Sequence, residues 1–332
     1  MPAEFEPHSG CWMAWPCNSL AFGDRLDQAR NAYAAVARAI SEFEPVTMIA
    51  NPGDLDAARA GCGPGIGVLE MDIDDSWTRD AGPTFVVDPS GRVAGVDWRF
   101  NGWGGVFPDH ARDAQMARAI LAHLNMRRIP ADFVLEGGAI HVDGQGTLLA
   151  AAPCLLDPRR NPGLSLGDLE ELLARFLGVK TFIWLDHGLE NDETAGHIDN
   201  VACFAAPGTI LLCSSSDPLD GNHATMRENA RKLRSSRDAA GRAPTVVEIE
   251  QPARKEGKDG RLAMSYINFY LPNGGVVAPS FDDPRDEEAL ATLKKVFPGR
   301  RVVQVPGLDI VYGGGCIHCI TQQQPLGSPL AP

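Results

Sequence analysis

The chain has 332 residues, of which 44% are apolar and 22% charged, and its formal net charge is −13. This composition supports a sizeable buried core, disfavours intrinsic disorder, and argues against nucleic acid or an anionic membrane as a partner. No apolar run reaches the ~20 residues of a membrane span, the opening MPAEFEPH lacks the features of a signal peptide, and eight cysteines are scattered along the chain. We therefore expect a cytoplasmic protein with reduced thiols.

A pattern of hairpin, helix and strand recurs along the chain. Four pairs of short apolar runs flank turn residues and predict hairpins, at Pro83–Trp98, Gly138–Ala151, Ala202–Cys213 and Ile267–Pro279. A helical pattern follows each hairpin, at Asp109–Leu124, Ser165–Gly178, Asn222–Ser236 and Asp283–Gly299. Each helix leads to one more predicted strand, with the sequences DFVLEGG, TFIWLD, VVEIE and VVQVPG.

A fifth unit can be assembled from the two ends of the chain. The closing GCIHCIT is expected to pair with the opening CWMAWP, which precedes a helix at Asp24–Phe43 and the strand VTMIA. We therefore predict an α/β fold, a five-unit pseudo-symmetric propeller closed by strands from both chain ends. A single catalytic domain would span residues 1–325, and residues 326–332 would fray. The alternative is an ordinary two-domain α/β protein.

Polar residues cluster at the start of several hairpins. The clusters are DDSWTRDAGP (74–83), LEGG (135–138), DETAGHIDN (192–200) and GGGCIHC (313–319). Units arranged around an axis would bring Asp80, Glu136, His197 and Asp199 to one pocket. His197 and Asp199, two residues apart, would share one face of a strand. Each residue also has a plainer interpretation, such as a salt bridge between Asp80 and Arg79.

The C-terminal GGGCIHCITQQQP suggests a reactive thiol. A haem attachment motif is excluded because Ile320, not histidine, follows the second cysteine, and no second ligand pair supports zinc. A redox pair of Cys316 and Cys319 is disfavoured because the stretch resembles a strand rather than a helix start. A thiolate nucleophile is the best remaining hypothesis. His318 should point away from Cys319, so His197 is the candidate partner.

At these residues the sequence resembles the agmatine deiminase family of the guanidine-modifying pentein superfamily. The resemblance covers nearly the whole chain through CWMAWP, WTRDAGP, RFNGWGG, LEGGAIHVDGQGTLL, DETAGHIDN and GGGCIHCITQQQP. It implies a five-unit α/β propeller that uses neither metal nor organic cofactor. The chain departs from the family where it has Ala195 in place of Asp or Asn and Cys316 in place of Asn, and it is shorter than typical members.

The resemblance also implies a role for each candidate residue. Cys319 matches the nucleophile, His197 the general acid and base, and Glu136 the carboxylate that orients it. Asp80 and Asp199 match the pair that grips the guanidinium, and Trp77 matches an aromatic wall.

The implied reaction is hydrolysis of agmatine to N-carbamoylputrescine and ammonia through a cysteine thiouronium, as in putrescine biosynthesis. Glu193 and Asp192 can add negative charge for the substrate's distal ammonium. The expected partner is a small cationic guanidine, with neither nucleic acid nor membrane, and a homo-oligomer is an open expectation. Alternatives are a deiminase or amidinotransferase acting on another guanidine, a non-catalytic guanidine-binding protein, and a thiol-redox protein.

Overall fold

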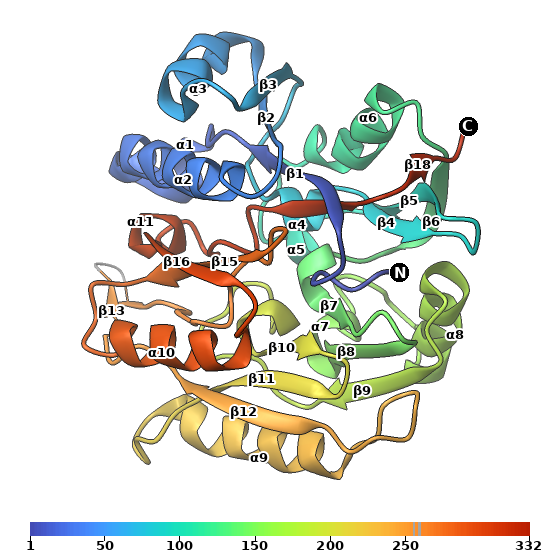
Figure 1. Cartoon of the computed structure of the whole chain (residues 1–332), viewed down its shortest axis with the longest axis vertical. Helices are drawn as coiled ribbons and strands as arrows, with labels where there is room; N and C mark the ends of the chain where they lie inside the picture. The colour runs from blue at the N-terminus through green and yellow to red at the C-terminus, as the bar shows by residue number, and fades with distance from the viewer. Residues whose placement is uncertain (255, 258–259) are drawn as a thin grey trace.

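Short sheets occupy the middle of the molecule, and the longer helices lie at its rim (Figure 1). The computed structural model describes residues 1–254, 256–257 and 260–332. The fold is mixed α/β. No helix in these ranges has the length and apolarity that a bilayer span requires.

Five sheets share one pattern, in which an antiparallel pair of strands is followed by a parallel strand. The first sheet contains β17 (Gln322–Pro325), β1 (His8–Ala14), β2 (Val46–Ala50) and β3 (Gly67–Glu70). The next three contain β4 (Thr84–Val87), β5 (Arg92–Arg99) and β6 (Arg128–Val134); β7 (Ile140–Val142), β8 (Thr147–Ala151) and β9 (Thr181–Leu185); and β10 (Ala202–Ala206), β11 (Thr209–Ser214) and β12 (Thr245–Glu250). In the fifth, Tyr270 bridges β15 (Gly275–Ser280), which pairs with β16 (Arg301–Pro306). A small separate pair is formed by β13 (Glu256–Gly257) and β14 (Gly260–Arg261).

The predicted hairpins are therefore present, with one reduced. The hairpin expected at Ile267–Pro279 keeps only one full strand, because its first arm is a single bridge at Tyr270. The first unit also has an unpredicted addition, helix α3 (Leu55–Cys62) followed by strand β3.

The two chain ends meet, as predicted, but in a different register. β1 and β17 run antiparallel, with Trp12 opposite Gln322, and they lie side by side in Figure 1. The prediction that GCIHCIT is itself the closing strand is wrong, because residues 317–320 form turns and the strand begins at Gln322. The segment expected to fray makes backbone contacts, since β18 (Ser328–Pro329) pairs with β5.

The helices follow from local signals. In α2 (Leu26–Ser41), Ala29, Tyr33, Val36 and Ile40 recur at helical spacing and are buried. Ser165 and Asp168 form a capping box at the start of α8 (Leu166–Leu177), which ends at a left-handed Gly178. The other helices are α1 (Ser19–Phe22), α3 (Leu55–Cys62), α4 (Thr78–Ala81), α5 (Gly102–Gly105), α6 (Met116–His123), α7 (Ala152–Leu155), α9 (Gly221–Ser235), α10 (Asp286–Val296) and α11 (Leu308–Val311). The helix predicted from Asp109 begins only at Met116, after a single 3-10 turn.

Candidate active site

Cys319 lies in the turns that connect the glycines at 313–315 to β17. Its Sγ accepts a hydrogen bond from Asn268 Nδ2 at 3.2 Å and lies 3.4 Å from Asp199 Oδ2. Its carbonyl accepts a hydrogen bond from the backbone N–H of Arg79. The thiol is therefore buried and fixed on several sides by segments that are distant in the sequence.

Two aspartates face the same point as the thiol. Asp80, on the single-turn helix α4, accepts hydrogen bonds from Trp103 Nε1 at 2.8 Å and from the backbone N–H of Gly138 at 2.9 Å. Asp199 lies in a 3-10 turn, and its Oδ2 accepts a hydrogen bond from His318 Nδ1 at 2.9 Å. Its buried Oδ1 has no hydrogen-bond partner among the described residues.

His197 is fully buried between carboxylates. Its Nδ1 lies 3.7 Å from Asp80 Oδ2, and its Nε2 lies 3.7 Å from Glu136 Oε2. Glu136 is itself held by Arg160, whose Nε donates to both carboxylate oxygens at 2.8 and 3.0 Å. Glu136 is thus placed to orient the imidazole, and Arg160 to fix Glu136.

Two glycines allow these groups to approach one another. A Cβ at Gly138 would lie 2.6 Å from His197 Nδ1, 2.8 Å from Asp80 Oδ1 and 3.0 Å from Asp199 Oδ2. A Cβ at Gly315 would lie 2.6 Å from the Trp77 ring and 3.0 Å from Cys319 Sγ. The structure therefore brings all the predicted catalytic groups together, around positions where no side chain fits.

A pocket leads to Cys319, which forms part of its lining. Aromatic rings and backbone glycines form its walls, and the two carboxylates on its lining are those of Asp80 and Glu193. Within the described ranges, the lining includes no Lys, Arg or His. The lining residues are Trp77, Asp80, Trp103, Val106, Phe107, Glu193, Thr194, Asn200, Gly313, Gly314, Gly315 and Cys319. A flat cation suits such an acidic, aromatic cavity.

Burial and neighbouring charges set the protonation states. Burial and the charges of Asp199 and Asp80 raise the pKa of the Cys319 thiol well above its usual range. Burial lowers the pKa of His197, but Asp80, Cys154 and Glu136 outweigh burial and raise it well above normal overall. These pKa directions favour a protonated thiol at Cys319 and an imidazolium at His197, and a bound cation would favour the thiolate.

Comparison with known proteins identifies the family. A family model described as Porphyromonas-type peptidyl-arginine deiminase matches residues 1–325. The chain belongs to this family. Agmatine deiminase from Pseudomonas aeruginosa strain LESB58 is 49% identical over 98% of this chain and 95% of its own length.

Solved structures of the same kind superpose closely. The agmatine deiminase of Enterococcus faecalis matches with a TM-score of 0.95 and 36% identity, over 98% of this chain and 95% of that one. A cysteine-to-serine variant of the C. jejuni agmatine deiminase, described as having substrate bound, matches with a TM-score of 0.91 and 26% identity, over 99% of this chain and 96% of that one.

The local conformation of several site residues in this chain differs from the prediction. His197 and Asp199 are not on a strand, because His197 precedes the 3-10 turn Ile198–Asn200. They still reach one site, since the turn directs both side chains towards Gly138. Arg79 does not pair with Asp80, because it contacts Glu4 and Gln323 instead.

The two family departures also have structural settings. The Cys316 sulfur packs against Gly307, among apolar neighbours, and burial raises its pKa to about 12. Both Cys316 and Cys319 are free thiols. Ala195 has a left-handed backbone with φ of +64°, a conformation that Asp and Asn adopt more readily than Ala.

Sequence reasoning missed three polar contacts of the site. Trp103 donates to Asp80 and lines the pocket. Asn268 contacts the Cys319 sulfur, and Arg160 holds Glu136. The motif RFNGWGG, which contains Trp103, was a signal that could have been used; Asn268 and Arg160 carried no comparable local signal.

Proposed function

We propose that this protein is an agmatine deiminase that hydrolyses agmatine to N-carbamoylputrescine and ammonia. The observation that carries the proposal is the convergence of the Cys319 thiol, the His197 imidazole and the carboxylates of Asp80 and Asp199 at one acidic pocket. Relatives named agmatine deiminase, 44–49% identical over 98% of the chain, support the same substrate.

Binding depends on paired carboxylates. A guanidinium is planar and cationic at every physiological pH, and two carboxylates can accept its N–H groups along two edges. Asp199 Oδ1, buried and without a partner in the described structure, is one acceptor, and Asp80 is the other. Charge-assisted hydrogen bonds of this kind contribute about 1.5–3 kcal/mol each. Trp77 forms an aromatic wall beside the bound plane.

The first chemical step forms a covalent intermediate. The bound cation stabilises the Cys319 thiolate, and the thiol proton leaves to solvent as the substrate's charge arrives. The sulfur attacks the central guanidinium carbon, and an S–C bond forms. The His197 imidazolium gives its proton to one nitrogen, the C–N bond breaks and ammonia departs. A positively charged thiouronium remains on Cys319.

The second step consumes one water molecule. His197, now neutral, accepts a proton from water, and the resulting hydroxide attacks the same carbon. The C–S bond breaks, the hydroxyl proton of the tetrahedral adduct passes to solvent, and the neutral ureido product and the Cys319 thiolate are released. Glu136, held by Arg160, keeps the imidazole oriented and favours its charged form through both steps.

The distal part of the pocket favours agmatine over arginine. Agmatine ends in an ammonium group, whereas arginine ends in an α-amino acid whose carboxylate needs a cationic partner. The lining described above offers the carboxylate of Glu193 at the pocket mouth and no cationic side chain. We assign Glu193 to the substrate's distal ammonium, with Asp192 adding negative charge nearby.

The test compares ammonia release from agmatine, free arginine and a peptide with a terminal arginine, together with acid-quench mass spectrometry for the thiouronium on Cys319. Agmatine should have the highest kcat/KM, Cys319→Ser should abolish turnover, and Cys316→Asn should retain it. Higher kcat/KM with arginine or the peptide would overturn the substrate assignment. Dependence of product on an added amine would indicate an amidinotransferase, and binding without turnover that survives Cys319→Ala would indicate a binding protein. If Cys316 and Cys319 cycle between dithiol and disulfide, and still do so in the Asp80→Ala variant, the protein would be a thiol-redox protein.

The same proposal includes the architecture. We propose that the five sheets form a pseudo-symmetric propeller closed by β1 and β17, in one catalytic domain spanning residues 1–325. The scattered cysteines of the sequence support the cytoplasm as the compartment. A homo-oligomer is compatible with this arrangement and can be tested by sedimentation.

A further inference from the structure

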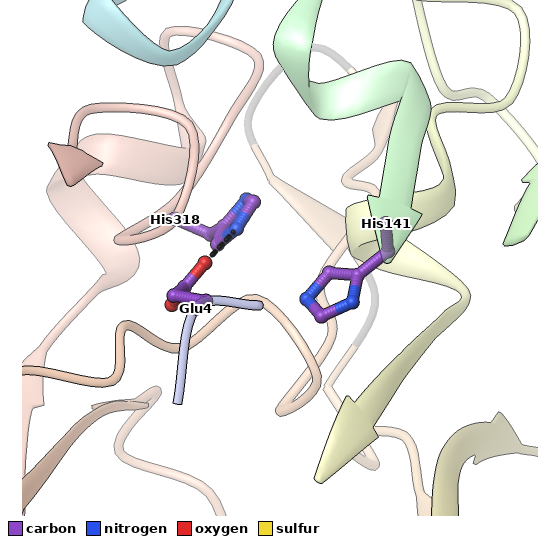
Figure 2. A group of neighbouring side chains, drawn as sticks. All are labelled: Glu4, His141 and His318. Carbon is purple, nitrogen blue, oxygen red and sulfur yellow. Dashed lines mark hydrogen bonds and ion pairs between the residues drawn. The ribbon is translucent and has the colours of Figure 1, made fainter. Parts of the chain in front are cut away.

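A chain of three buried polar side chains continues behind the substrate pocket. Glu4 Oε2 lies 2.8 Å from His318 Nε2, and His318 Nδ1 lies 2.9 Å from Asp199 Oδ2. Figure 2 shows the Glu4 carboxylate directed at the His318 ring, with the His141 ring nearby. The three linked side chains are 1–5% exposed. The N-terminal segment thus reaches a substrate-binding carboxylate through one histidine.

Glu4 and His318, the two side chains behind Asp199, are each fixed by further hydrogen bonds. Glu4 Oε1 accepts the backbone N–H of Leu271 at 2.9 Å, and its Oε2 lies 3.4 Å from Arg79 Nη2. The backbone N–H of His318 donates to Asn268 Oδ1 at 2.9 Å. Because Asn268 also contacts the Cys319 sulfur, the histidine and the thiol share one anchor.

Each ring nitrogen of His318 faces a carboxylate oxygen, which determines its protonation. A neutral imidazole has one N–H, so one of the two carboxylates would then face a lone pair. Both contacts are hydrogen bonds only if the ring is an imidazolium. Burial and Arg79 lower the pKa of His318, but Glu4 and Asp199 outweigh them and raise it overall.

The other charged and titratable groups around the ring are consistent with this state. Burial lowers the pKa of His141 to about 4, and its Nδ1 accepts the backbone N–H of Phe204, so it is neutral. Arg79 already supplies positive charge to Glu4. A metal ion held by Glu4, His141 and His318 would have to displace the His318 N–H and lie beside this guanidinium, so we interpret the cluster as a hydrogen-bonded relay.

We propose that His318, held by Glu4, is a positioning residue that fixes Asp199 for substrate. Its N–H occupies Oδ2 and leaves Oδ1 directed at the guanidinium, and its charge keeps Asp199 ionised beside the Cys319 thiol. The role of Asp199 rests on the proposed function. Through Glu4, the N-terminal segment thereby completes the substrate site.

The first test separates the two contacts of His318. His318→Asn places an amide N–H near the former Nδ1 and can keep the bond to Asp199, whereas His318→Gln places it near the former Nε2 and can keep only the bond to Glu4. We expect KM for agmatine to rise about 10- to 100-fold in His318→Gln and less in His318→Asn, because one charge-assisted hydrogen bond is lost. His141→Gln, in the same cluster but without a contact to Asp199, is the matched control and should change KM less than twofold. Equal KM values for His318→Gln and the wild type would overturn the proposal.

The second test combines a readout that does not depend on turnover with a pH profile that does. Nitrogen-15 NMR of histidine-labelled protein should show His318 as an imidazolium at neutral pH in the wild type. In Glu4→Gln, which keeps the side-chain shape, the removed charge lowers the pKa of His318. Catalysis needs His318 in its charged form, which is lost as the pH rises through the pKa of the ring. The alkaline limb of kcat/KM should therefore move to lower pH in Glu4→Gln.

These two measurements distinguish the proposals from each other. A neutral His318 in the wild type, or a Glu4→Gln profile that coincides with the wild type, would refute the relay even if agmatine is the substrate. Absence of agmatine turnover, with the imidazolium present and responsive to Glu4→Gln, would refute the substrate assignment and leave the relay intact. A thermal melt of each variant, unchanged within a few degrees, confirms that folding is not the cause.

Discussion

Removing the charge of Asp199 should make Cys319 more reactive while it weakens catalysis. Asp199 Oδ2 lies 3.4 Å from the sulfur, and its charge is one cause of the raised thiol pKa. Two unit charges at that distance repel by about 5 kcal/mol at an effective dielectric constant of ~20. The His318 cation on the same oxygen offsets part of this. We therefore expect Asp199→Asn to raise the thiolate fraction by at least about tenfold at a given pH.

The assay is alkylation of Cys319 by iodoacetamide between about pH 7 and pH 9, with the modified cysteine located by mass spectrometry. In the wild type the rate should rise about tenfold per pH unit without reaching a plateau, because the thiol is still largely protonated. Asp199→Asn should react faster at each pH, although it releases ammonia from agmatine more slowly. Glu193→Gln, which removes an exposed carboxylate at the pocket mouth, is the matched control and should leave the alkylation rate close to the wild type.

The opposite pattern would refute this reasoning. A wild-type rate that is already at its plateau near neutral pH would mean that His197 and Cys319 form a stable imidazolium–thiolate pair without substrate. An Asp199→Asn rate equal to or below that of the wild type would show that the carboxylate does not suppress ionisation of the thiol.

Three further predictions concern single contacts. Trp103→Phe removes the hydrogen bond to Asp80 and should lower kcat/KM for agmatine about tenfold or more, with an unchanged melt; a smaller loss would show that the indole N–H is dispensable. Ala195→Gly relieves the strain of the positive φ and should stabilise the fold by about 0.5–1 kcal/mol. Calorimetry should show this as a rise of about 1 °C in Tm, and a lower Tm would show that Ala195 is not strained. Gly315→Ala forces a methyl group against Trp77 and Cys319 and should reduce ammonia release at least about 100-fold. Near-normal activity would show that Trp77 and Cys319 can move away from the added methyl group.

Local signals predicted most of the elements because each depends on neighbouring residues. The serine cap and terminal glycine of α8 are an example, since Ser165, Asp168 and Gly178 act within a few positions of the helix ends. The start of α6 was placed too early because acidic residues before Met116 mimic a first helical turn, while the chain there forms a single 3-10 turn.

The site required information that no short window contains. His197 and Asp199 converge with Asp80 because their segments pack around Gly138, and Asp199 also contacts the Cys319 sulfur, although the backbone after His197 is a turn and not the predicted strand. The repeat pattern and the family motifs indicated that convergence. The relay through Glu4 joins residues 314 positions apart, and a strand interpretation of the last motif directed His318 away from the pocket without giving it a partner.

The charges of the site explain why the thiol should ionise only when substrate arrives. Three buried carboxylates are matched in number by three cationic side chains, so the group is close to balanced while Cys319 keeps its proton. The pairs are His197 with Asp80, Arg160 with Glu136, and His318 with Asp199. A guanidinium adds one positive charge to this balance, and loss of the thiol proton removes one. Binding and thiolate formation are therefore coupled, and a neutral isostere of the substrate should bind without increasing the alkylation of Cys319.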